Sequence, residues 1–152
     1  MINSQMMQAL CHRSNQILAS LVSIIPKNKS YIKIDNRPGF MSVHINKIMT
    51  ICGYTIYSVS HWYLQEGDVM QDPEMLFWND LNDKELFYAG LYRHDALGIY
   101  QESIYVIHVN NLPEIRFWWR MQAEHTRFAN EWLKTIVEQQ GIIIPNTKKK
   151  EI

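Results

Sequence analysis

The stretch from His61 to Trp78 limits the possible folds of this chain more than any other stretch. Both of its ends are rich in aromatic and β-branched residues, which is typical of β-strands. Its middle, residues 66–74, contains four acidic residues together with Gly67 and Pro73, a composition typical of a connection between strands. We therefore predict a β-hairpin with an acidic connection, preceded by a helix and the first strands and followed by further strands and a second helix.

The composition is that of one folded domain, and we treat residues 1–152 as a single unit. The 15 basic and 15 acidic side chains give a formal charge of zero, so the overall charge does not favour nucleic-acid binding. Cys11 and Cys52 lack metal-ligand spacing, which predicts a reduced cytoplasmic protein without disulfides or zinc. No stretch resembles a secretory signal or approaches the roughly 20 apolar residues of a membrane helix, so we expect no membrane partner.

Two helices are predicted from apolar residues that recur every three or four positions. The first covers about residues 4–25 and ends at Pro26. The second covers about residues 121–141, with Gly141 suited to its C-terminus. We expect the basic tail, about residues 145–152, to be disordered. The apolar stripe of the second helix consists of His125, Phe128, Ala129, Trp132, Leu133, Ile136 and Val137.

Between the helices, alternating apolar and polar residues and short turns predict an antiparallel meander. The expected strands are residues 40–45, 54–65, 75–79, 85–92 and 103–109, with a short additional strand over 31–34 and a loop over 94–98. Residues 46–53 fit a loop or a helical turn. Residues 114–119 fit a strand or a helix, and Asn110 and Asn111 offer caps for a helix. The predicted fold class is thus α+β, an antiparallel sheet of about five strands with the N-terminal and C-terminal helices packed on it.

Four acidic residues, Glu66, Asp68, Asp72 and Glu74, lie close together in the predicted connection. Carboxylate oxygens are the ligands that magnesium and calcium prefer, but this spacing is not that of a calcium-binding loop. We therefore expect the segment to bind no structural metal. Asp72 is expected to brace the connection through hydrogen bonds, whereas Glu66 and Asp68 are expected to be exposed.

A second polar cluster lies between Arg93 and Glu102. Its adjacent His94 and Asp95 suggest an acid–base pair, although the side chains of neighbouring residues rarely face each other. No nucleophile elbow and no glycine-rich phosphate loop accompany the cluster. The sequence therefore favours a non-catalytic protein without a cofactor.

Three segments together resemble an uncharacterised bacterial domain family. The segment Glu66–Met75 resembles its Gly-Asp-x-Met-x-Asp-Pro-Glu-Met signature, Leu97–Glu102 is similar to its Gly-x-Tyr-Gln-Glu segment, and Phe128–Gly141 resembles its closing helix. The similarity covers about residues 40–141. Members are carried largely on plasmids, phages and integrative elements, and the family has no established activity. The resemblance implies that the matched polar positions form one surface, which consists of Asp68, Asp72, Glu74, Tyr100, Gln101 and Glu102.

These observations lead to three hypotheses about function. The first is a non-catalytic accessory protein of a mobile element that binds a host or element protein, with host defence systems as one class of target. The second is a divalent-metal-dependent enzyme that uses the acidic residues Asp68, Asp72, Glu74 and Glu102. The third is a nucleic-acid-binding accessory protein. It requires five basic residues on one face: Lys27, Lys29, Arg116, Arg120 and Arg127.

Overall fold

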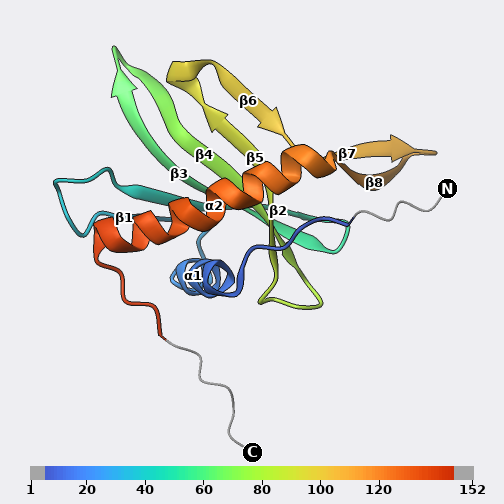
Figure 1. Ribbon diagram of the computed structural model, residues 1–152, viewed down its shortest axis with the longest axis horizontal. Coiled ribbons are helices and arrows are strands. Elements are labelled where there is room, and N and C mark those ends of the chain that lie inside the picture. The colour runs from blue at the N-terminus through green and yellow to red at the C-terminus, as the bar shows by residue number, and fades with distance from the viewer. Residues whose placement is uncertain (1–5, 146–152) are drawn as a thin grey trace, which may run out of the picture.

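The computed structural model describes residues 6–145, which form an α+β domain as predicted (Figure 1). Its elements follow the order α1 (His12–Ser23), β1 (Tyr31–Ile34), β2 (Val43–Ile51), β3 (Tyr54–Gln65), β4 (Asp68–Asp80), β5 (Phe87–His94), the 3-10 turn η1 (Asp95–Leu97), β6 (Ile99–Glu102), β7 (Ile104–Val109), β8 (Leu112–Phe117) and α2 (Trp119–Gln140). Within the described residues, no helix has the length and apolar character needed to cross a membrane.

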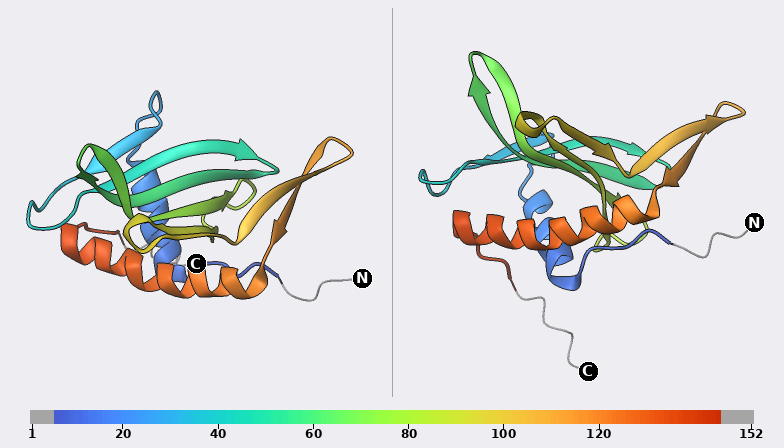
Figure 2. Two further views of the ribbon diagram at one scale, coloured as in Figure 1. Left: turned by 90° about the horizontal axis from the view of Figure 1, so that it is seen from above. Right: turned by 45° about the horizontal axis from the view of Figure 1, so that its top comes forward.

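The strands confirm the predicted antiparallel meander. β1 to β6 form one sheet in sequence order. The sheet has six strands instead of the expected five, because β1 and β6 belong to it and the strand predicted over residues 103–109 does not. β7 and β8 form a separate two-stranded hairpin, which we call the arm. Figure 2 shows that the arm extends beyond the six-stranded sheet.

The main core lies between the two helices and one face of the six-stranded sheet, as the predicted packing of both helices requires. We call this the helix face and the opposite one the open face. The core side chains of the helix face include Ile17, Leu18 and Leu21 of α1, Ala129, Leu133 and Ile136 of α2, and Val43, Val59, Met75 and Phe77 of the sheet. A smaller cluster on the open face joins Ile104 of the arm to Ile56 and Trp78.

The first helix is shorter than predicted. It begins at His12 instead of residue 4, and residues 4 and 5 lie outside the described part of the chain. Leu10 is buried in an extended segment, and its N–H donates to the carbonyl of Phe87 at 3.0 Å. The Asn15 side chain bonds both the Leu10 carbonyl at 3.1 Å and the Phe87 N–H at 3.0 Å. The apolar spacing before residue 12 therefore reflects packing of an extended segment, and the helical prediction was wrong there.

The predicted acidic connection of residues 66–74 is also too long. Glu66 and Gly67, with φ angles of 52° and 89°, form a two-residue turn. Gly67 adopts the left-handed conformation without steric cost because it has no Cβ atom, whereas Glu66 is a non-glycine residue in that region. Pairing resumes at Asp68, so the other acidic residues belong to β4. The sequence suggested a loop because Asp72 and Pro73 form a bulge within that strand, where a proline does not interrupt the hydrogen-bonded ladder.

Two further segments differ from their predictions, and a third was left open between strand and helix. Residues 46–51 continue β2, and the turn is confined to Cys52 and Gly53. Asn110 and Asn111, with φ angles of 52° and 64°, form the two-residue turn of the arm instead of capping a helix. Residues 114–119, which fitted either a strand or a helix, contain the end of β8 and the start of α2.

The remaining elements lie close to their predicted positions. The strand predicted over 85–92 lies two residues later, as β5, and β6 begins directly after the predicted loop of residues 94–98. The C-terminal helix is confirmed, with Gly141 at a φ angle of 62° as its C-terminal cap. Of its predicted apolar stripe, only Phe128 is exposed. Most of the tail predicted to be disordered, residues 146–152, lies outside the described residues.

Candidate functional site

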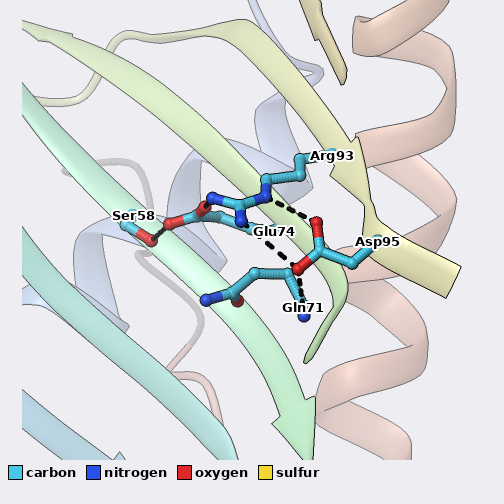
Figure 3. Close-up of polar contacts among 5 residues, drawn as sticks. All are labelled: Ser58, Gln71, Glu74, Arg93 and Asp95. Atoms are coloured by element: carbon cyan, nitrogen blue, oxygen red, sulfur yellow. Dashed lines mark hydrogen bonds and ion pairs between the residues drawn. The ribbon is translucent and has the colours of Figure 1, made fainter. Parts of the chain in front are cut away.

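A polar network joins β3, β4 and β5 on the open face (Figure 3). Glu74 accepts a hydrogen bond from the Ser58 hydroxyl at 2.6 Å and forms an ion pair with Arg93 at 3.7 Å. Arg93 also donates to both carboxylate oxygens of Asp95, at 2.7 and 3.3 Å. The backbone N–H of Gln71 donates to Asp95 at 2.9 Å. We call these five residues the Arg93 network, because the guanidinium of Arg93 contacts the carboxylates of both Glu74 and Asp95.

The charges of the network stabilise one another. The hydrogen bond from Arg93 lowers the pKa of Asp95, and the Gln71 N–H acts in the same direction. The same bond to Asp95 raises the pKa of Arg93, and the nearby Glu74 carboxylate adds to that effect. Arg93 and Asp95 are therefore both charged at neutral pH. Two carboxylate side chains, Glu74 and Asp95, face one guanidinium, so acidic residues outnumber basic ones in the network.

The register of the sheet places the network in a row of polar side chains. Each residue of the row is the direct cross-strand neighbour of the next, about 5 Å away. From β1 to β6 the row consists of Lys33, His44, Ser60, Glu74, Arg93 and Tyr100. Tyr100 ends the row with 63% of its surface exposed, so the row presents an aromatic ring to solvent beside a fixed charged network.

Aromatic rings pack around His44, near the β1 end of this row. The His44 ring neighbours the rings of Tyr31 and Trp62, with centroid distances of 5.9 and 4.4 Å. Its two ring nitrogens are bonded by the hydroxyls of Tyr31 at 2.6 Å and Ser42 at 3.2 Å. Burial, with a smaller contribution from the charge of Lys33, lowers the pKa of His44 to about 4. His44 is therefore a neutral structural residue at neutral pH.

The six residues matched by the family resemblance are divided between the two faces of the sheet. Glu74, Tyr100 and Glu102 lie on the open face, in register with Arg93 and Leu91. Tyr100, Gln101 and Glu102 are consecutive in β6, and side chains alternate between faces along a strand, so the middle residue points to the helix face. The resemblance implied one surface made of all six residues, but in the structure their side chains lie on both faces of the sheet.

The other three matched residues have separate environments. A carboxylate oxygen of Asp72 lies 2.6 Å from His94 Nε2, and Asp72 also lies near Tyr92 on the helix face. The predicted brace was a hydrogen bond from Tyr100 or Gln101, whereas the Gln101 side chain bonds His125 and the neighbour of Asp72 is His94. Asp68 and Glu66 are exposed at the β3–β4 turn, as predicted. Gln101 accepts a hydrogen bond from His125 of α2 at 3.1 Å.

The arrangement of Ser103, His125 and Gln101 resembles a hydrolytic triad in its residue types. The Ser103 hydroxyl donates to His125 Nδ1 at 2.7 Å, and His125 Nε2 donates to Gln101 at 3.1 Å. However, Ser103 and His125 are both buried, and burial lowers the pKa of His125 to about 4. A buried hydroxyl has no path to a substrate, so these residues link the start of the arm to α2.

The suggested acid–base pair of His94 and Asp95 does not form. His94 contacts Asp72 on the helix face, whereas Asp95 accepts from Arg93 on the open face. Residues 6–145 contain no group of three or more histidine, cysteine or acidic side chains placed to hold a metal ion. Cys11 and Cys52 are free and exposed.

Sequence reasoning missed the roles of Ser58 and Arg93. Arg93 was considered only as the first residue of a polar loop, but it lies in β5. The available signal was that Glu74 and Arg93 carry opposite charges near the ends of two successive predicted strands. Opposite charges on neighbouring antiparallel strands often pair directly, and here they do.

Comparison with known proteins identifies a family but no characterised relative. The family model described as "Domain of unknown function (DUF6908)" matches residues 5–142, which include α1 as well as the sheet and α2. No curated protein and no solved structure matches the chain. Because the match covers most of the sequence, the chain belongs to this family of domains of unknown function, DUF6908.

Proposed function

We propose that this chain is a non-catalytic accessory protein of a mobile genetic element and that it acts by binding a partner protein. The mobile-element context is supported by the resemblance of Glu66–Met75 and Leu97–Glu102 to a family carried on such elements. Protein binding is supported by the open face, where ordered polar groups lie beside an exposed aromatic ring.

The observation that carries this proposal is the direct neighbourhood of Glu74, Arg93 and Tyr100. The ion pairs fix the Arg93 side chain before any partner arrives, so binding costs little side-chain entropy. Tyrosine and arginine are enriched among the residues that contribute most to protein interfaces. Tyr100 is the exposed anchor of this surface, and Arg93 is its preorganised support.

The charge of the surface indicates the kind of partner. Glu74 and Asp95 outnumber Arg93, and the exposed Glu102 adds a further negative charge beside them. Complementary charges favour a basic partner surface and accelerate its association. We therefore propose a basic protein surface of the kind that holds nucleic acid in a host defence system.

The metal-dependent alternative has less support. It requires Asp68, Asp72, Glu74 and Glu102 to converge on one cation. Asp72 lies on the helix face with His94, whereas Glu74 and Glu102 lie on the open face. Glu74 already accepts from Ser58 and pairs with Arg93.

The test compares protein capture from a bacterial host lysate by the parent chain and by Tyr100→Ala. Proteins that the parent captures are identified, purified and titrated against both chains. We expect one basic protein to bind the parent directly and the variant at least about ten-fold more weakly, the effect of losing an interface anchor. Trp118→Ala, which alters an exposed aromatic residue between β8 and α2, is the matched control and should bind like the parent.

Two results would contradict the proposal. The first is a parent chain that recovers no protein that binds it after purification. The second is a partner whose affinity is unchanged by Tyr100→Ala and by Glu102→Lys, because both exposed side chains lie on the open face. A partner lost with Trp118→Ala would place the binding surface on the arm instead.

A further inference from the structure

A second exposed surface lies where the arm meets the start of α2. Trp118 is 60% exposed and Trp119 is 43% exposed, whereas Trp78 and Trp132 are buried in the cores. Two adjacent tryptophans in solvent are a large apolar surface for a chain of this size, and such surfaces mark interaction sites. We call Tyr105, Arg116, Trp118, Trp119 and Arg120 the junction surface.

The aromatic rings of the junction surface are held in place by their neighbours. The rings of Tyr105 and Trp118 stack at a centroid distance of 6.1 Å with an angle of 29° between their planes. The N–H of Trp118 donates to the Ser103 carbonyl at 2.8 Å, which fixes the backbone at the junction. Arg120 lies over the ring of Trp119 at 5.0 Å. The exposed rings are therefore ordered before any ligand binds.

The cations of the junction surface are only partly neutralised. Among the ion pairs of the described residues, none engages Arg120, and the nearby Arg116 pairs with the exposed Glu114 at 2.6 Å. The first turn of α2 contains no acidic residue and has no side-chain cap. The free N–H groups and the dipole at a helix start add positive potential, and here they lie beside the two arginines.

We propose that the junction surface binds single-stranded nucleic acid. Unpaired bases stack on the rings of Trp118 and Trp119, while Arg116 and Arg120 contact the phosphates. Exposed aromatic rings interleaved with cations are the usual platform for single strands, because every base has a flat face that a ring can cover. A paired duplex hides those faces, so the surface discriminates in favour of single strands.

The proposed binding of nucleic acid uses only some of the five basic residues that the sequence suggested for this role. Lys27 and Lys29 lie in the loop between α1 and β1, far from the start of α2 in the left view of Figure 2. The five basic residues therefore do not share one face. Arg116 and Arg120 remain together because β8 leads directly into α2.

Fluorescence anisotropy of a labelled oligothymidylate of about 12 nucleotides tests the proposal, since single-strand sites cover about 4–16 nucleotides. We expect the full chain to bind this probe at about 50 mM salt and to bind more weakly at about 200 mM. A duplex probe of the same length should bind more weakly than the single strand. Quenching of tryptophan fluorescence on titration would report stacking directly.

The variants separate stacking from charge. Trp118→Ala should weaken binding about ten-fold or more, whereas Trp118→Phe keeps a ring and should retain most of the affinity. Arg120→Gln should weaken binding and reduce the slope of log affinity against log salt by about 1. Tyr100→Ala removes an equally exposed ring from the open face and should leave oligonucleotide affinity unchanged. Circular dichroism checks that each variant is folded.

The proposal is overturned if the parent chain does not bind the probe at low salt. It is also overturned if Trp118→Ala and Arg120→Gln both bind like the parent. Loss of a purified protein partner with Trp118→Ala, without oligonucleotide binding by the parent, would assign the junction surface to protein recognition. Because protein binding is tested with Tyr100→Ala, failure of one proposal is distinguishable from failure of the other.

Discussion

His94 Nε2 of β5 lies 2.6 Å from a carboxylate oxygen of Asp72 in β4, on the face opposite to the ion pair of Glu74 and Arg93. Asp72 and Glu74 are only two residues apart, a spacing that normally leaves both side chains on one face of a strand. The bulge at Asp72 and Pro73 changes this alternation. The two acidic residues therefore stabilise the same pair of strands from opposite sides, and they cannot act as one cluster.

This separation predicts that a chelator will not change the thermal stability of the protein. A metal bound only to the folded chain would raise the melting temperature by mass action, but Asp72 and Glu74 already contact His94, Ser58 and Arg93. Melting with and without EDTA measures this directly. A lower melting temperature with EDTA that magnesium or calcium restores would show a structural cation.

The Arg93 network should contribute measurably to stability. Asp95→Asn replaces a carboxylate that accepts from the Arg93 guanidinium and the Gln71 N–H. Hydrogen bonds to charged groups contribute about 1.5–3 kcal/mol when shielded, and partial exposure to solvent reduces this to about 1 kcal/mol. Urea denaturation measures the loss. Asp68→Asn, at an exposed position in the β3–β4 hairpin, is the matched control and should change stability by less than about 0.5 kcal/mol. Equal effects of the two variants would show that the network contributes nothing.

Trp132 should be a main anchor of α2. Its ring meets His61 edge-on at 5.6 Å and stacks with Phe128 at 6.0 Å, within the core between helix and sheet. Trp132→Ala should destabilise the fold by about 3–5 kcal/mol through lost burial and the remaining cavity. Lys134→Ala, at an exposed position on the same helix, should have little effect. Equal melting of the tryptophan variant and the parent would mean that α2 does not pack as described.

The two histidines with lowered pKa values predict a loss of stability in mild acid. In the unfolded chain a histidine titrates near 6.5, whereas burial lowers the pKa of His125 to about 4 and that of His44 to about 4. Between these values the unfolded state binds more protons, so stability falls as pH decreases from about 6.5 to 4. NMR titration should show both rings neutral until pH approaches 4. His125→Gln should make the pH dependence shallower, and a ring that titrates near 6.5 would contradict its burial.

The sequence predicted those elements whose signals are local. β3 was predicted with both of its observed ends, because aromatic and β-branched residues fill Tyr54–Gln65 and turn residues flank it. α2 was predicted because an apolar stripe precedes Gly141. The extended segment before His12 was missed because it is defined by a hydrogen bond to Phe87, which is distant in sequence.

The candidate site depends on register, which the sequence does not specify. The alignment of Glu74 with Arg93 follows from two irregularities: the bulge at Asp72 and Pro73, and a shift of one residue at Gly90 between β4 and β5. A one-residue change in pairing exchanges the two faces of a strand. Pattern analysis therefore identified most of the polar residues but not which of them share a face.

Gly90 offers a direct test of how the arm is attached. A Cβ atom at this position would lie 2.7 Å from the Trp78 ring and 3.1 Å from Ile104 of β7. Both neighbours are buried, so neither can move aside without disturbing the packing of the arm on the open face. Gly90→Ala should therefore destabilise the protein by about 1–3 kcal/mol, the usual cost of overpacking. Denaturant unfolding gives the value.

Gly39→Ala is the matched control for this substitution. A Cβ atom at Gly39 would meet nothing within 4 Å, and its φ angle lies outside the left-handed region. The added methyl group there should be neutral or slightly stabilising, because alanine restricts the unfolded chain. If both alanine variants unfold like the parent, Trp78 and Ile104 do not pack tightly around Gly90. The arm would then be free to move relative to the sheet, and the ordered ring positions that the junction surface requires would lose their support.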